Sequence, residues 1–288
     1  GRVILTLGSD LDTPFYARSA AKPFQTTVSQ RNGADLGPEQ LAVVSGSHGG
    51  QPIHIAYIRE LLGEVGLGEE HLLCPPSWPM STDAVLRAAR SGIASAMPVF
   101  HNCSGKHAGM LRACVARGWS LHYDAADHPL QVENAAFLAE VSGQPVEPSG
   151  IDGCGVPTFR TTVSGLAAAF AKLAVFPEFA EVRTAMSRFG SLTSDGERRE
   201  ARLARWVPAA VKGGAQGCLG VAWYGGLGIA AKSWTGDPEP AVIGVIEALR
   251  RLGILPDYPA EMLEPTARPP VTGGGRPVGT LQPIGGLD

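Results

Sequence analysis

Ser19 and Lys22 are residues that can do chemistry together, and they stand three positions apart in Arg18-Ser19-Ala20-Ala21-Lys22-Pro23. Residues i and i+3 share one face of a helix. Pro23 has no N–H for the Ser19 carbonyl, so we expect the first turn to tighten to 3₁₀ geometry, in which i and i+3 eclipse. A lysine kept uncharged could then take the serine proton and activate the hydroxyl for nucleophilic attack. The alternative is that Ser19 only caps a helix and Lys22 is a solvated surface residue.

A second candidate is Ser47-His48, within the glycine-rich segment Ser45-Gly46-Ser47-His48-Gly49-Gly50. Glycines adopt backbone conformations that other residues resist, so this loop can present the serine and histidine side chains at the end of an element. The alternative is an exposed polar loop with a solvated histidine.

Lys232 lies near the end of an apolar segment that we interpret as a strand, in Lys232-Ser233-Trp234-Thr235-Gly236. If its side chain faces Ser19 or Ser47, it brings a second cation close to Lys22, and a nearby like charge lowers the pKa of a lysine. Lowering that pKa from about 10.4 to near 7 costs roughly 4–5 kcal/mol, which a buried pair can sustain and an exposed pair cannot. The alternative is that Lys232 extends its ammonium into water.

Cys103, Lys106 and Cys154 form a candidate metal site, because thiolates are preferred ligands of Zn²⁺. Two cysteines and a lysine are an incomplete zinc pattern, since an amine is an uncommon ligand. The alternative is a pair of buried free cysteines, which behave as small hydrophobic residues. The chain has five cysteines, an odd number with wide spacing, which argues against a disulfide framework.

The composition indicates a soluble protein that acts on small molecules. The net charge of −3 and the pI near 6.2 provide no basic surface of the kind that binds nucleic acid. The longest apolar run, residues 163–176, contains Lys172 and is too short to cross a bilayer. The N-terminus lacks the basic and then apolar pattern of a signal peptide, so we expect a cytoplasmic protein without a membrane partner.

Periodicity predicts the elements that must position these residues. Residues 3–7 are apolar and β-branched and predict a strand before the Ser19 segment. Residues 217–223 and 227–234 flank Tyr224-Gly225-Gly226 and predict a β-hairpin, and a last strand or hairpin is expected over residues 271–284. Helices are predicted over residues 23–30, 52–65, 82–90, 108–117, 129–141, 164–174, 177–188 and 240–252.

Strands at both ends of the chain and helices in the middle favour an α+β fold. We expect one antiparallel sheet, built from both chain ends, with an all-helical insertion. The chain would be a single catalytic unit over residues 1–288, with a sheet lobe over residues 1–50 and 205–288 and a helical lobe over residues 51–204.

Taken in order, these motifs resemble those of the Rhizobium-type, or class 3, L-asparaginases, also called the asparaginase II family. The resemblance covers almost the whole chain, and its two longer motifs are specific. It rests on Arg18-Ser19-Ala20-Ala21-Lys22-Pro23, Ser47-His48, His101-Asn102-Cys103-Ser104-Gly105-Lys106-His107-Ala108-Gly109, Gly150-Ile151-Asp152-Gly153-Cys154-Gly155-Val156-Pro157, Lys212-Gly213-Gly214-Ala215 and Gly228-Ile229-Ala230-Ala231-Lys232.

The resemblance implies a serine-β-lactamase-like or glutaminase-like fold, a homodimer, and hydrolysis of L-asparagine to L-aspartate and ammonia. It implies two Ser-Lys pairs, Ser19 with Lys22 and Ser47 with Lys232. The implied zinc ligands are Cys103, Lys106 and Cys154. The implied substrate pocket is lined by Arg18, His48, Lys106, His107 and Asp152.

We predict that a lysine amine, that of Lys22 held neutral by Lys232 and burial, takes the proton of Ser19 directly or through Ser47. The serine then attacks the side-chain amide of the substrate. The arginine and the aspartate of the pocket have the charges that pair with an amino acid's carboxylate and ammonium.

Three alternative functions stay open. The nearest is a glutaminase. The second is a penicillin-recognising serine acyltransferase or β-lactamase, because Ser-x-x-Lys and a strand lysine shortly before Thr-Gly also resemble that group. The third is a non-catalytic protein that binds an amino acid or a metal.

Overall fold

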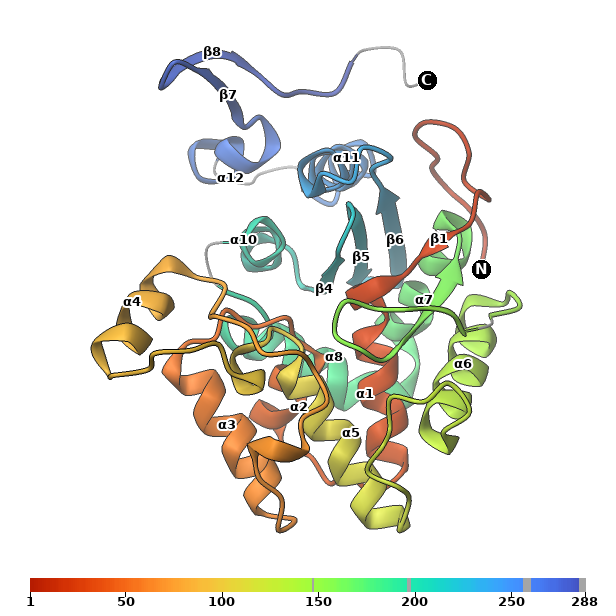
Figure 1. Ribbon diagram of the computed structural model, residues 1–288. Coiled ribbons are helices and arrows are strands. Elements are labelled where there is room, and N and C mark those ends of the chain that lie inside the picture. Colours follow the sequence, from red (N-terminus) through yellow and green to blue (C-terminus); the bar gives the residue numbers. More distant parts are fainter. Residues whose placement is uncertain (147, 196–197, 256–259, 285–288) are drawn as a thin grey trace.

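The chain folds into a mostly helical body and a small antiparallel sheet, in agreement with the α+β class predicted from the sequence (Figure 1). The computed structural model describes residues 1–146, 148–195, 198–255 and 260–284. The longer helices of the body are α1 (Lys22–Arg31), α2 (Pro38–Ser45), α3 (Pro52–Gly63), α4 (Thr82–Arg90), α5 (Ser104–Arg117), α6 (Pro129–Ser142), α7 (Val163–Val175) and α8 (Ala180–Arg188). Shorter turns of helix are η1 (Arg18–Ala21), η2 (Glu69–His71), η3 (Pro98–Phe100), η4 (Pro177–Phe179) and α9 (Gly190–Thr193).

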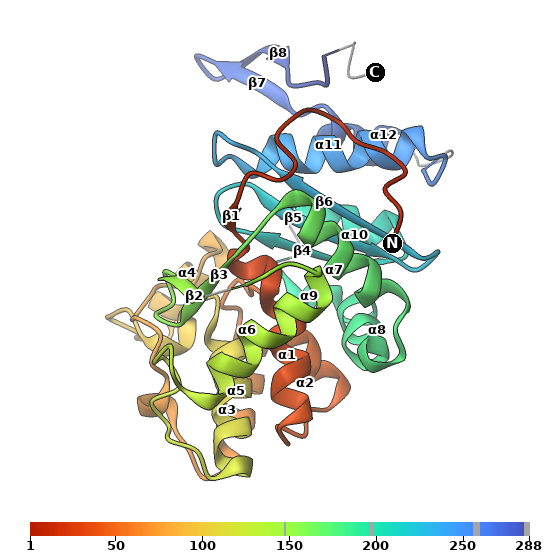
Figure 2. The same ribbon diagram turned by 90° about the vertical axis from the view of Figure 1, so that its right-hand side faces the viewer.

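The main sheet has the strand order β4-β5-β6 and lies between two layers of helix. Its strands are β4 (Ala209–Gly214), β5 (Cys218–Trp223) and β6 (Leu227–Lys232), and each pair of neighbours is antiparallel. Helix α7 packs on one face, and α11 (Pro238–Arg251) packs on the other (Figure 2). Two further helices, α10 (Arg199–Trp206) and α12 (Ala260–Ala267), contact α11.

Side chains of this sheet alternate between two buried cores, because successive residues of a strand point to opposite faces. Ala210 and Ala222 belong to the larger core, which extends through the helical body. Ala209 and Val221 belong to the smaller core beneath α11. The even-numbered positions of β4 therefore face the helical body, and Lys212 is one of them.

Two smaller pairings complete the strands. In one, β3 (Pro157–Thr161) lies between β1 (Phe15–Tyr16) and β2 (Pro148–Ile151). In the other, β7 (Pro270–Gly273) and β8 (Arg276–Thr280) form an exposed hairpin. The prediction of one sheet built from both chain ends is wrong, because the N-terminal strand pairs with β3 from the middle of the chain and the main sheet comes from residues 209–232 alone.

The strand predicted over residues 3–7 is also absent from the structure. Val3 is 71% exposed and Ile4 is 52% exposed, and neither packs in a core. A β-branched run favours a strand only where a neighbouring strand and a buried face stabilise it. Most predicted helices are confirmed within a few residues, but α5 begins at Ser104 and so includes Lys106 in its first turn.

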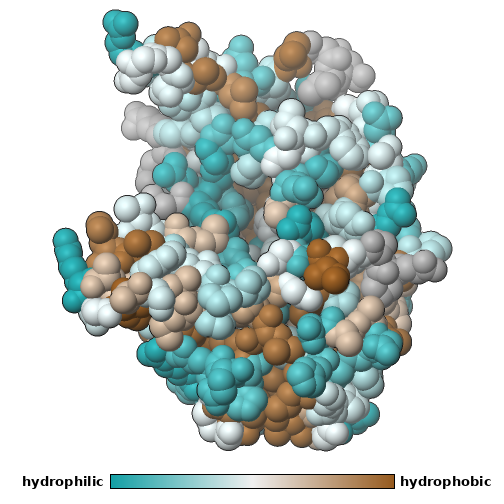
Figure 3. Space-filling view, viewed as in Figure 1, coloured by the Kyte–Doolittle hydropathy of each residue, from teal (hydrophilic) through white to brown (hydrophobic). Residues whose placement is uncertain are grey.

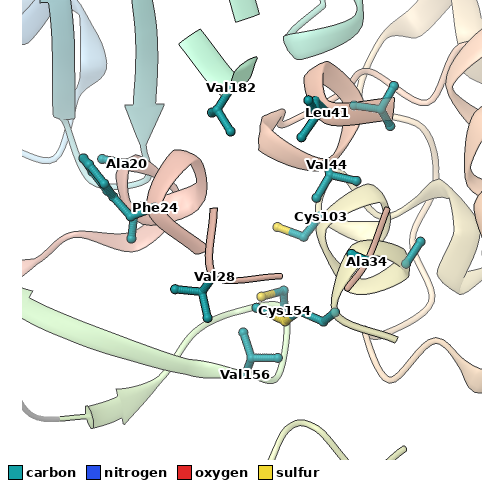
Figure 4. Close-up of a cluster of buried hydrophobic side chains, with 14 of the residues drawn as sticks. Ala20, Phe24, Val28, Ala34, Leu41, Val44, Cys103, Cys154, Val156 and Val182 are labelled. Atoms are coloured by element: carbon teal, nitrogen blue, oxygen red, sulfur yellow. The ribbon is translucent and has the colours of Figure 1, made fainter. Parts of the chain in front are cut away.

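Glycines let α2 and α5 lie unusually close together. A Cβ on Gly105 would lie 2.7 Å from the Val43 carbonyl oxygen, and one on Gly109 would lie 2.6 Å from Val44 Cγ1, so larger residues do not fit. Figure 4 shows Val44 beside Cys103 in this core. The loop that follows α2 is thereby brought against the N-terminus of α5.

Among the described residues, no single helix combines the length and the apolarity needed to cross a membrane. Residues 163–175 and 177–188 meet such a test only as a pair, and the two helices meet at 83°. Apolar side chains stay exposed near α4, on the left of Figure 3, and they include Trp78, Met80 and Leu86. Scattered apolar side chains of this kind are common on protein surfaces.

Candidate active site

The first turn of α1 has the tightened geometry that the sequence predicts. It is the 3₁₀ turn η1, in which the Lys22 backbone N–H donates to the Ser19 carbonyl. The two side chains have different surroundings, because Lys22 is 1% exposed and Ser19 is only partly buried. The hydrogen-bond partners that the structure gives for Lys22 Nζ are Gly46, Ser47 and Asn102, and not Ser19.

Lys22 and Ser47 meet in a buried place. Lys22 Nζ lies 3.0 Å from Ser47 Oγ and 3.4 Å from the Asn102 carbonyl oxygen, and it also contacts the Gly46 carbonyl oxygen. As an ammonium, Lys22 can donate its three N–H groups to these three oxygen atoms, whereas as an uncharged amine it would donate two and accept the Ser47 hydroxyl proton on its lone pair. Ser47 is 3% exposed, and its N–H donates to the Thr193 carbonyl at 2.8 Å.

The predicted pairing of Ser47 with Lys232 is not formed. The Lys232 ammonium donates to the carbonyl oxygens of Gln216 at 2.6 Å and Ser233 at 2.5 Å. Lys232 lies on β6, two strands away from β4, and neighbouring strands are separated by about 4.8 Å. The lysine that could approach the Ser47 loop from this sheet must therefore come from β4.

Lys212 of β4 is that lysine, although the sequence analysis gave it no role of its own. It is 3% exposed and faces the helical body, and its ammonium donates to the Gly213 carbonyl at 2.6 Å. Burial, followed by the positive charge of Lys22, lowers the pKa of Lys212 to about 7. Lys22 thus contacts the serine loop, and Lys212 is a second buried lysine near enough to Lys22 for their charges to interact.

Gly214 explains how β4 approaches the turn that carries Ser19. A Cβ at this position would lie 2.7 Å from the Ala17 carbonyl oxygen and 3.2 Å from the Ala20 nitrogen, so only glycine fits. Glycine in a strand often marks the close approach of another backbone. The glycine pair after Lys212 is therefore the signal in the sequence that could have identified this lysine.

Burial and like charge together disfavour protonation of both lysines. Burial is the main cause that lowers the pKa of Lys22; the Cys103 thiol opposes this shift, and the Lys106 ammonium adds to it. The charge of Lys22 also contributes to the lowered pKa of Lys212, after burial. With a pKa of about 7, Lys212 can be uncharged near neutral pH.

Cys103, Lys106 and Cys154 lie together. Lys106 Nζ donates to Cys154 Sγ at 3.2 Å. The hydrogen bond with Cys154 is the main cause that holds the pKa of Cys103 well below its usual range, against the effect of burial. The same contact and burial raise the pKa of Cys154. Burial disfavours the Lys106 charge, but the two sulfurs outweigh it and raise the pKa of Lys106.

These three side chains are a possible donor set for a metal. Among the described residues, no group of three or more His, Cys, Asp and Glu side chains could hold a metal ion. A site at Cys103 and Cys154, whose side chains Figure 4 shows near each other, would therefore need the Lys106 amine as its third protein ligand.

Arg18 and Asp152 form an ion pair at the partly exposed side of the site. Arg18 Nε donates to Asp152 Oδ1 at 2.5 Å, and Arg18 Nη1 donates to Gln216 Oε1 at 3.3 Å. Asp152 Oδ1 also accepts the Gly153 N–H at 2.8 Å. Arg18 has φ +48°, in the left-handed region that side chains disfavour by roughly 1–2 kcal/mol. This backbone conformation is thus held by the surrounding contacts.

His48 is neutral and fully engaged. Its Nδ1 accepts the Gly50 N–H at 3.2 Å, and its Nε2 lies 3.0 Å from Ser104 Oγ, whose hydroxyl donates to the Val99 carbonyl. Burial, helped by His54, lowers its pKa well below the usual value. A contact between His48 and a substrate would require one of these bonds to break.

His107 differs from His48 because one of its two ring nitrogens has no hydrogen-bond partner among the described residues. Its Nδ1 lies 2.8 Å from the Tyr123 hydroxyl. Its Nε2 is buried and has no hydrogen-bond partner within the described part of the chain. Because buried polar atoms are almost always paired, this nitrogen is a candidate ligand contact.

Buried histidines predict a stability that falls in mild acid. Burial is the main cause that lowers the pKa of His48, His54 and His107. Each has a pKa of about 6.5 in the unfolded chain, so below that pH the unfolded state binds protons that the folded state does not. The free energy of unfolding should therefore drop as the pH falls from 6.5 toward the lowered folded values, by up to about 1.4 kcal/mol per pH unit for each histidine.

Urea unfolding between pH 7.5 and pH 5 measures this slope. His54→Gln removes one of the three titrations and should make the dependence on pH shallower. His122→Gln, at an exposed position, is the control and should leave the slope unchanged. An equal slope in all three proteins would contradict the prediction.

The comparisons with known proteins agree with the motifs. The chain matches the family model described as L-asparaginase II over residues 1–283 of its 288 residues. No curated protein matches it. The matched region contains all the site residues described above, and the family predicted from the motifs is confirmed. The chain therefore belongs to the L-asparaginase II family.

Proposed function

We propose that this protein is an L-asparaginase, which hydrolyses the side-chain amide of L-asparagine to L-aspartate and ammonia. Membership of the family supports this reaction class. The observation that carries the proposal is the buried contact of 3.0 Å between Lys22 Nζ and Ser47 Oγ. Lys22 lies one helical turn after Ser19, which is partly exposed. A serine hydroxyl activated by an uncharged amine is what serine–lysine acyl transfer requires.

In this proposal Lys212, and not Lys232, is the second cation whose charge disfavours protonation of Lys22. Its charge and the burial of both side chains favour loss of a proton from the pair of lysines near pH 7. A catalytic base works best when its pKa lies near the operating pH. Lys22 is the member of the pair that contacts a serine hydroxyl, so it is the base.

Ser19 is the attacking group, because a substrate can reach it from solvent whereas Ser47 is 3% exposed. Ser19 Oγ bonds to the amide carbon while its proton passes through Ser47 to the Lys22 amine. The carbon–nitrogen bond then breaks, the nitrogen leaves as ammonia with that proton, and an ester remains on Ser19. A water molecule that gives its proton to Lys22 by the same route attacks the ester carbon. The bond from that carbon to Ser19 Oγ breaks, the proton returns from Lys22 to Ser19, and L-aspartate is released.

Arg18 and Asp152 bind the two charged groups of the amino acid. Arg18 pairs with the α-carboxylate and Asp152 with the α-ammonium, which requires the ion pair between them to open or to be shared. The free Nε2 of His107 is a further candidate contact for the substrate. A site built from such groups rejects analogues that lack them more strongly than it rejects an extra methylene, so glutamine is the competitor that matters.

Cys103, Lys106 and Cys154 would hold a zinc ion. The Cys103 thiol is already disposed to lose its proton, and two thiolates with one amine leave a fourth position of a tetrahedron open. When bound there, zinc would keep the thiols deprotonated and could polarise an oxygen atom of the substrate.

Metal analysis of the purified protein tests the zinc site. We expect about one zinc per chain in the wild type and none in the Cys103→Ser/Cys154→Ser variant, while Cys74→Ser, at another buried cysteine, serves as the control. A wild-type protein that stays free of metal after incubation with zinc would contradict the site. Turnover that is unchanged in metal-free protein would assign the metal to structure or to affinity.

Replacing either serine should stop the reaction. Ser19→Ala and Ser47→Ala should each lower kcat for ammonia release from L-asparagine by at least about 10³-fold, because residues that act as a unit are lost together. Ser9→Ala, at an exposed serine, is the control and should keep the wild-type rate.

The location of the acyl group in the intermediate shows which of the two serines is the nucleophile. Rapid quenching and peptide mapping should place a mass increase on the peptide that contains Ser19. Full activity of Ser19→Ala, or an acyl group on Ser47, would remove Ser19 as the nucleophile. Ammonia release from L-glutamine alone would replace the proposed substrate.

Removing Lys212 should raise the pKa of the base. In Lys212→Met the repulsion that favours an uncharged Lys22 is gone, so the acid limb of the kcat/KM profile for L-asparagine should move to higher pH by about one unit or more. Lys172→Met, at a lysine on α7 whose ammonium donates to the Glu140 carbonyl, is the control and should leave the profile in place. Activity lost equally at every pH would show instead that Lys212 is itself the base.

A further inference from the structure

The Lys232 side chain is held by backbone carbonyls and aromatic rings. Its ammonium donates to the carbonyl oxygens of Gln216 and Ser233, at 2.6 Å and 2.5 Å. It also lies 5.9 Å from the centre of the Phe15 ring and 5.2 Å from that of Trp234, within the range of a cation–π contact. Carbonyls and aromatic rings thus surround a charge that has no carboxylate partner among the described residues.

The principal partner of Lys232 is a strained residue in the turn between β4 and β5. Gln216 has φ +63°, a left-handed conformation that is unfavourable for a residue with a side chain. Such a conformation persists only where the surroundings determine it. Besides the pairing of Gly214 with Cys218 that closes the turn, β6 contributes the bond from Lys232 to the Gln216 carbonyl, and the Ser233 N–H donates to the Gly217 carbonyl at 2.7 Å.

The side chain of Gln216 contacts the ion pair of Arg18 and Asp152. Its Oε1 accepts a hydrogen bond from Arg18 Nη1 at 3.3 Å, and Arg18 Nε donates to Asp152 at 2.5 Å. The Arg18 guanidinium is thus held by two side chains, Asp152 at Nε and Gln216 at Nη1. A continuous series of contacts therefore runs from Lys232 through Gln216 to Arg18 and Asp152.

We propose that Lys232 and Gln216 are positioning residues that set the affinity of Arg18 for the α-carboxylate of an amino-acid substrate. Lys232 fixes the strained turn, Gln216 orients the guanidinium, and Arg18 meets the carboxylate without a further loss of side-chain freedom. This inference rests on the proposed function, in which Arg18 and Asp152 bind the amino-acid group. It assigns to Lys232 a part in binding in place of the part in proton transfer that the sequence suggested.

Steady-state kinetics and calorimetry of four variants test the assignment. Lys232→Met keeps an apolar chain between the rings and removes the charge, and Lys232→Arg restores a cation. Gln216→Asn keeps an amide that tolerates the left-handed turn but shortens its reach to Arg18. Lys172→Met removes an ammonium that donates to the Glu140 carbonyl at 2.6 Å, a different partner from those of Lys232, and serves as the control.

The expected result is a change in binding and not in chemistry. Lys232→Met and Gln216→Asn should each raise KM for L-asparagine and Kd for L-aspartate by about tenfold, with kcat within about twofold of the wild type. Their double variant should be no weaker than either alone, because the two residues act in series. Lys232→Arg should recover most of the affinity, and Lys172→Met should match the wild type.

Other outcomes overturn one conclusion or the other. Unchanged KM and Kd in Lys232→Met, or a 100-fold loss of kcat with Kd unchanged, would refute the positioning role. A wild type that binds L-aspartate but releases no ammonia from L-asparagine would refute the proposed reaction, and weaker L-aspartate binding by Lys232→Met would still support the positioning role. A wild type that does neither would refute both.

Discussion

The structure depends on the burial of two lysine side chains, Lys22 and Lys212, which are near enough for their charges to interact. An ammonium loses its hydration on burial, and a second ammonium nearby adds repulsion, so neither charge is stable there unless other groups offset these effects. Carbonyl oxygens receive the N–H groups of Lys22, and nearby thiols supply partial compensation. The net effect lowers the pKa of both lysines, that of Lys212 to about 7.

Close contacts between backbones bury these groups. Helix α5 lies against α2 at Gly105 and Gly109, and β4 lies against the turn of Ser19 at Gly214. A third contact closes the serine loop, since a Cβ on Gly46 would lie 2.5 Å from the Thr193 carbonyl oxygen. Each glycine removes a side chain that would otherwise separate two elements, and the amine, the hydroxyl and the thiols can meet only because these separations are small.

Charged groups of the site lie at two depths below the surface. The amines and thiols lie inside, at positions that are less than about one-tenth exposed, whereas the ion pair of Arg18 and Asp152 lies nearer to solvent. An amino acid with a side-chain amide has the matching arrangement, with its charged groups at one end and its neutral amide at the other. The outer pair can hold the charged end while the amide approaches Ser19. Arg18 and Gln216, two of the non-glycine residues with positive φ, both belong to this outer part, so backbone strain accompanies the ion pair.

Much of this could be predicted from the sequence, because it depends on local pattern. The 3₁₀ turn at Ser19 follows from Pro23, the amphipathic helices follow from their periodicity, and the ordered motifs identify the family. The homodimer and the zinc ion stay predictions. Contacts within one chain do not bear on the dimer, and among the described residues no group of three or more His, Cys, Asp and Glu side chains could hold a metal. What only the tertiary structure decided is which distant residues meet. Lys212 and Lys232 are both lysines of the same sheet. Strand order and register, which the sequence does not encode locally, bring Lys212 near enough to Lys22 for their charges to interact and put Lys232 in contact with Gln216.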